Sequence, residues 1–117
     1  MAHDYELKNH NDLDVAAKTA VDQIVEGERT AFDGWLAYGA VLLRGRKAYP
    51  GDLEFGRWKD SVLEGYDKFR PHQEEERAAM WAADDLDLFQ KVREAFPMSR
   101  TVRGLYSKYH ANIEMFE

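Results

Sequence analysis

The chain has 117 residues, of which 44% are apolar and 13% are aromatic, and its net charge is −6 at pH 7. This length suits one compact domain, and the apolar content argues against a mostly disordered chain. The absence of cysteine excludes thiol catalysis, iron–sulfur clusters and cysteine-bound zinc. No long apolar run and no signal-peptide pattern occur, so we expect a cytoplasmic protein without a membrane segment.

Residues 12–48 carry apolar side chains at mostly helical spacing, and Pro50 ends this pattern. The spacing predicts one long helix, which follows a lead-in at residues 1–11 that we expect to be mobile. The alternative is a break at Gly27, because Thr30 can begin a capping box for a second helix. Each glycine in this stretch costs about 1 kcal/mol relative to alanine, so packing must hold the helix.

Small residues recur in the second half of this stretch, and they permit the close approach of another helix. They are Gly34, Ala37, Gly39, Ala40 and Gly45. The approaching helix can belong to the same chain or to a second copy. Because paired identical surfaces are the commonest assembly, we expect a homodimer that uses this face.

The next predicted helix has Asp52 as its cap and ends before Gly65. Residues 66–72 predict a loop, because Pro71 disfavours helix in the residue before it but suits a first helical turn. The glutamates at positions 74–76 then lie near the positive end of the following helix.

Asp85 can cap a further helix that ends near Pro97, and Ser99 begins the last one. The apolar stripe of this last helix is Val102, Leu105, Tyr106 and Tyr109. We therefore predict an all-α fold of about five helices in a single domain, residues 1–117. A long N-terminal helix packs on a compact bundle of shorter ones, and residues 85–113 form a helix-turn-helix-like pair.

The charge is unevenly distributed along the chain. Residues 91–108 contain five basic side chains and one acid, so this segment carries +4 and the remainder carries −10. A short helix, a turn and a second helix follow in the order typical of DNA-binding helix-turn-helix motifs, whose second helix enters the major groove. The residues that we expect to contact duplex DNA are Ser99, Arg100, Thr101, Arg103, Ser107 and Lys108.

A second basic group, Arg44, Arg46 and Lys47, lies at the end of the long predicted helix. Positive charge is favourable there against the helix dipole, whatever the function. If this group lies beside the last helix, it extends the same phosphate-binding surface. A structural explanation also exists for both groups, since arginine and lysine stems commonly cover apolar surface.

No catalytic or metal-binding pattern occurs. The four histidines, His3, His10, His72 and His110, lack ligand spacing, and acids near helix starts are typical of caps. The glycine motifs of nucleotide-binding proteins and the serine elbow of hydrolases are also missing. We expect no enzyme activity, no cofactor, no metal and no small-molecule substrate.

Three short patterns within residues 30–63 are Trp35-x-x-x-Gly39-x-x-Leu42, Pro50-Gly51 and Glu54-Phe55-Gly56-x-Trp58. Together they resemble a group of small phage- and plasmid-encoded bacterial proteins of uncharacterised function. In that group a helix-turn-helix-like segment follows, and residues 76–81 or 100–103 could take its place here. The resemblance implies a mobile-element origin and a regulatory role, and it transfers no catalytic residue.

Two functions fit these observations. The first is a small regulator that binds duplex DNA through the helix beginning at Ser99, as a dimer on pseudo-palindromic half-sites. The second is a protein-interaction module that inhibits or redirects a host protein through its acidic surface.

Overall fold

The computed structural model describes residues 10–26, 32–66 and 69–117, and it has no strand in these ranges. Six α-helices follow one another there: α1 (His10–Glu26), α2 (Phe32–Ala48), α3 (Asp52–Leu63), α4 (Gln73–Asp84), α5 (Leu86–Ala95) and α6 (Val102–Ala111). A short 3₁₀ turn, η2 (Ile113–Phe116), comes after α6. The all-helical class is confirmed, with six described helices rather than about five.

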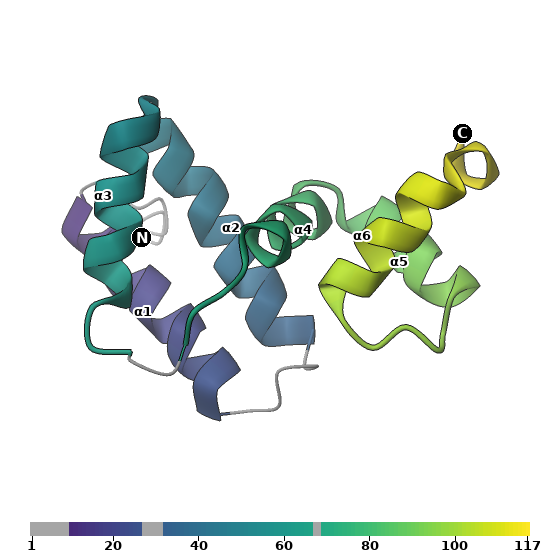
Figure 1. The fold of residues 1–117 in the computed structure, drawn as a ribbon, viewed down its shortest axis with the longest axis horizontal. Coiled ribbons are helices and arrows are strands. Elements are labelled where there is room, and N and C mark those ends of the chain that lie inside the picture. Colours follow the sequence, from purple (N-terminus) through teal and green to yellow (C-terminus); the bar gives the residue numbers. More distant parts are fainter. Residues whose placement is uncertain (1–9, 27–31, 67–68) are drawn as a thin grey trace, which may run out of the picture.

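Residues 12–48 do not form the single long helix that their spacing predicts. Instead α1 and α2 pack side by side (Figure 1), and a Cβ atom added at Gly34 would lie 3.0 Å from the Ile24 side chain. Folding back buries the apolar stripe of α1 instead of leaving it in solvent. The two-helix alternative is therefore correct, although the break itself, with Gly27 and Thr30, lies outside the described residues.

The interface between α2 and α4 depends on a glycine. A Cβ atom at Gly39 would overlap the carbonyl group of Ala79, so the two backbones meet only because residue 39 has no side chain. Gly45 similarly makes room for the Trp58 ring of α3. These glycines permit close approach as expected, but their neighbours belong to the same chain. The homodimer contact expected along this face is not available at Gly34 and Gly39, because α1 and α4 cover them.

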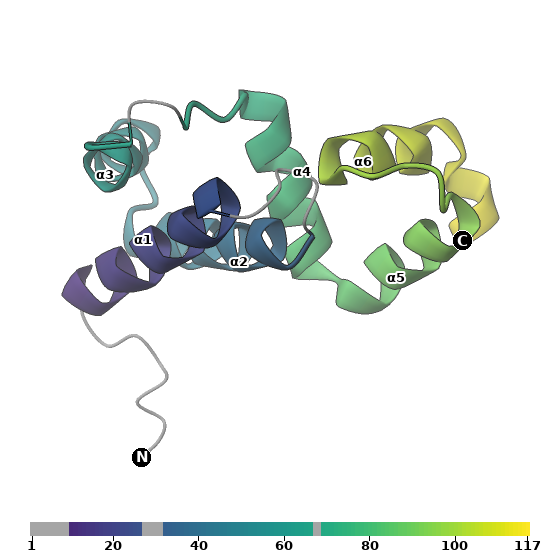
Figure 2. The same ribbon diagram turned by 90° about the horizontal axis from the view of Figure 1, so that it is seen from below.

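The central helix α4 joins two groups of helices. Figures 1 and 2 show α1, α2 and α3 at one end of the molecule, and α5 with α6 at the other. α4 packs against α2 on one side and against α5 and α6 on the other. Among the described helices, none is long and apolar enough to cross a membrane.

The predicted helix ends are confirmed in part. Asp85 caps α5, because its carboxylate accepts a hydrogen bond from the Leu88 N–H at 3.1 Å. Asp52 is not a cap: it is the first residue of α3, and its carboxylate pairs with Arg46. The predicted loop before α4 is non-helical in its described residues, and α4 begins at Gln73.

The close α2–α4 contact predicts that one methyl group added at residue 39 destabilises the fold. Gly39→Ala will lower the free energy of unfolding by about 1–3 kcal/mol, because the backbones must move apart. Gly56→Ala is the matched control, since this glycine also lies inside a helix but an added Cβ meets no atom within 4 Å. It should raise stability by about 0.5–1 kcal/mol. Urea denaturation measures both, and a fully stable Gly39→Ala protein would contradict this packing.

Candidate functional site

The connection between α5 and α6 holds three of the predicted DNA-contact residues. α6 begins at Val102, not at Ser99, and Thr101 is its N-cap: the Thr101 hydroxyl oxygen accepts a hydrogen bond from the Gly104 N–H at 2.9 Å. Ser99 and Arg100 lie before the helix. The predicted start is early by three residues because serine and threonine both make good caps, and the pattern alone cannot choose between them.

α6 turns its basic side chains toward solvent. Val102 and Leu105 are buried, whereas Arg103, Ser107 and Lys108 are exposed. The buried side of the helix packs against α4. This division between an apolar inner face and a basic outer face is the one that the spacing predicts.

The two cations of this outer face, Arg103 and Lys108, each contact another side chain of the protein. Arg103 pairs with Glu74 in the first turn of α4, with 2.7 Å between its Nη2 and the carboxylate Oε1. The side chains of this pair are 47% and 58% exposed, so water screens the attraction and the pair contributes little stability. The Lys108 ammonium lies 5.9 Å from the centre of the Phe96 ring. Arg103 and Lys108 are both exposed, so these contacts leave them accessible to solvent.

A cleft of about 520 Å³ lies between the start of α2 and the α5–α6 connection. Arg93 and Arg100 line it, together with Ser99 and, as the one acid among the described lining residues, Glu94. The guanidinium carbon of Arg93 lies 4.5 Å from the centre of the Phe32 ring. This is a cation–π contact, which limits the freedom of the Arg93 side chain.

The sequence indicates only one side of this cleft. It predicts Ser99 and Arg100 as contact residues, but it counts Arg93 only as part of the basic segment and treats Phe32 as core. Arg93 is exposed on α5, directly after the buried Val92, and this is the one local signal available. The pairing of Arg93 with Phe32 is a long-range contact that no local pattern encodes.

The second basic group lies far from the cleft. Arg44, Arg46 and Lys47 occupy the end of α2, whereas Phe32, which lines the cleft, is the first residue of that helix. A helix rises about 1.5 Å per residue, so about 20 Å separates them. Arg46 moreover pairs with Asp52. One cleft therefore cannot hold both basic groups.

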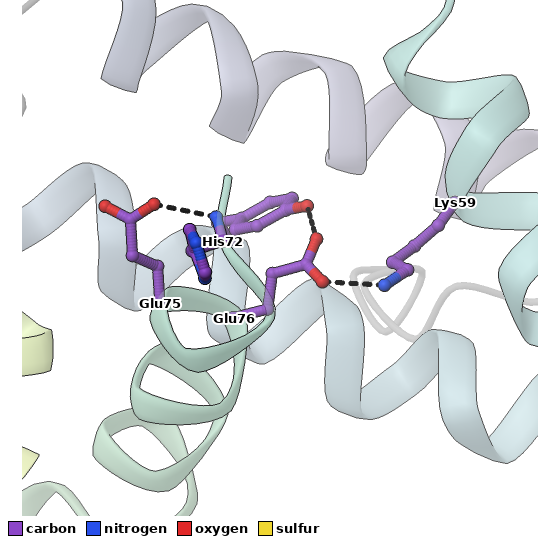
Figure 3. Close-up of polar contacts among 5 residues, drawn as sticks. Lys59, His72, Glu75 and Glu76 are labelled. Atoms are coloured by element: carbon purple, nitrogen blue, oxygen red, sulfur yellow. Dashed lines mark hydrogen bonds and ion pairs between the residues drawn. The ribbon is translucent and has the colours of Figure 1, made fainter. Parts of the chain in front are cut away.

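A buried carboxylate links three helices (Figure 3). Glu76 of α4 is only 7% exposed. Its Oε2 accepts a hydrogen bond from the Tyr38 hydroxyl of α2 at 2.7 Å, and its Oε1 lies 2.6 Å from the Lys59 ammonium of α3. The sequence assigns the three glutamates at 74–76 to the helix start. Glu76, however, lies three residues before the buried Ala79, and this spacing could have placed it on the inner face.

Known proteins give no guide to these sites. No protein-family model matches the chain, and neither a curated protein nor a solved structure matches it. The resemblance over residues 30–63 and the mobile-element origin therefore stay predictions. Within the described residues, no three or more histidine, aspartate or glutamate side chains are grouped to hold a metal ion.

The buried network predicts a stability loss in alkali. Burial, the charge of Glu76 and the hydrogen bond to it raise the pKa of Tyr38 above its ordinary value of 10.0. Above about pH 10 the unfolded chain loses this proton while the folded chain keeps it, so the free energy of unfolding falls as pH rises. Tyr38→Phe will make this slope shallower, and Tyr106→Phe is the control. Equal slopes in chemical denaturation for wild type and Tyr38→Phe would contradict the network.

Proposed function

We propose that the protein is a small non-enzymatic DNA-binding regulator of mobile-element origin that contacts duplex phosphates through its α5–α6 end. The observation that carries the proposal is the cleft in which Arg93 and Arg100 lie together. Among the described residues that line this cleft, two are cations and one, Glu94, is an acid, on a chain whose net charge is −6. A local positive site on an acidic protein is what selective binding of a polyanion requires.

The geometry of Arg93 suits a phosphate group. Among the described residues no carboxylate pairs with it, and its guanidinium carbon lies over the Phe32 ring. A planar guanidinium held in this way donates two parallel hydrogen bonds to phosphate with little loss of side-chain freedom. The Ser99 hydroxyl can donate another to the same phosphate.

In our proposal the exposed face of α6 extends this surface. Arg103, Ser107 and Lys108 are exposed, and Arg103 lies about one turn before the other two. In our proposal α5 and α6 act as a helix-turn-helix-like pair, with α6 against the duplex and the cleft on the adjacent phosphates. Two copies would then occupy paired half-sites.

We expect tight, salt-dependent binding to duplex DNA. Arg93→Ala with Arg100→Ala will weaken binding about tenfold or more, because each arginine loses a charge-assisted hydrogen bond. The slope of log affinity against log salt will fall by about 2. Arg93→Lys will keep the slope but bind less tightly, since lysine cannot bind phosphate with two parallel bonds. Fluorescence anisotropy with a labelled duplex over a salt series measures the wild type and both variants.

The matched control is Arg44→Ala with Lys47→Ala, which removes the same charge at the other end of α2. This pair should leave binding nearly unchanged. Equal losses in the two double variants, or no binding of wild type at low salt, would contradict the proposal. Capture of a stoichiometric bacterial protein after nuclease treatment would favour the protein-interaction function instead.

The Arg103–Glu74 pair predicts a variant that binds DNA more tightly. Glu74→Gln frees Arg103 and removes a nearby negative charge, so affinity should rise about two- to fivefold. Asp60→Asn makes the same charge change on α3, away from the proposed surface. If Asp60→Asn strengthened binding as much, net charge and not this ion pair would be responsible.

A further inference from the structure

A second cleft of about 610 Å³ lies between α3 and α4, separate from the arginine cleft. Its walls include Phe55 and Lys59 of α3, and Glu76, Arg77 and Met80 of α4. Figure 3 shows the Lys59 side chain reaching across from α3 to Glu76. The volume falls in the range of small-molecule sites, which is about 300–1,000 Å³.

The charges of this cleft favour an anion. Its described lining residues include three cations, Arg46, Lys59 and Arg77, and two acids, Asp52 and Glu76, so they sum to +1. Each acid is already paired, Asp52 with Arg46 and Glu76 with Lys59. The repulsion that these carboxylates would exert on a second anion is therefore largely neutralised.

Arg77 is the cation that remains available. It is exposed, and among the described residues no carboxylate pairs with it. The Lys59 ammonium has three donors, of which the Glu76 Oε1 takes one. An anionic group at this point can therefore accept hydrogen bonds from both Arg77 and Lys59.

The cleft also offers apolar surface. Phe55 and Met80 are half-buried along its walls. The Phe55 ring lies under two cations, with Arg46 at 5.0 Å and Lys59 at 5.5 Å from its centre. The ring is therefore held in place before any ligand arrives. Glu76, which also lines the cleft, is fixed by the hydrogen bond that it accepts from the Tyr38 hydroxyl. A site organised in advance loses little entropy on binding.

We propose that this cleft binds a small organic anion, with a carboxylate or phosphate group on an apolar body. The anionic group lies at Arg77 and Lys59, and the apolar body lies against Phe55 and Met80. This cleft shares no lining residue with the arginine cleft, so a test of DNA binding does not decide whether it binds an anion.

Titration of the ¹⁵N-labelled protein by NMR tests this inference. The probes are benzoate, phenyl phosphate and inorganic phosphate, with benzyl alcohol as the neutral analogue. We expect saturable shifts of the Gly56, Arg77 and Met80 amides with benzoate or phenyl phosphate, and weaker binding of the other two probes. The stronger of the two aromatic anions identifies the anionic group.

The variant Arg77→Gln should weaken binding of the preferred probe about tenfold, because a charge-assisted hydrogen bond is lost. Lys18→Gln removes one positive charge from α1, away from the cleft, and should not change the affinity. Dispersed spectra of both variants verify that they fold. Equal binding of benzyl alcohol, equal effects of the two variants, or shifts confined to the Arg93 and Arg100 cleft would overturn the proposal.

Discussion

The contact of the α2 and α4 backbones at Gly39 is the constraint on which the arrangement of the other helices depends. Because Gly39 meets Ala79, the neighbouring Tyr38 and Glu76 come within hydrogen-bond distance. A carboxylate taken into the interior costs several kcal/mol unless it is paired, and the Tyr38 hydroxyl and the Lys59 ammonium supply the pairing. One close approach therefore brings α2 and α4 together and draws α3 toward them.

The apolar stripes of this sequence are sufficient to predict helices, but not their directions. Residues 12–48 keep a helical period throughout, so the turn back between α1 and α2 leaves little trace in the spacing. The direction of α2 is decided by the burial of its apolar stripe against that of α1. This burial brings together residues such as Ile24 and Gly34, which a short sequence pattern does not relate to each other. The cap at Asp85 could be predicted because its hydrogen bond spans three residues.

Part of the candidate site could likewise be predicted from the sequence, and part could not. The basic segment at 91–108 is visible from counting charges, and the outer face of α6 follows from its period. The neighbours of these cations could not be predicted, since Phe32 of α2 reaches Arg93 of α5, and Glu74 of α4 reaches Arg103 of α6, only through tertiary packing. Both contacts join residues that are far apart in the chain.

The uneven charge of the molecule also bears on how fast it meets a partner. A polyanion attracts the segment at 91–108, which carries +4, and repels the remainder, which carries −10. Within about one Debye length of a polyanion, these opposing forces would exert a torque that turns the basic segment toward it. A larger share of the encounters with a polyanion is then made through the basic segment. If the protein binds duplex DNA as proposed, this charge asymmetry favours an approach in which the α5–α6 end meets the duplex first.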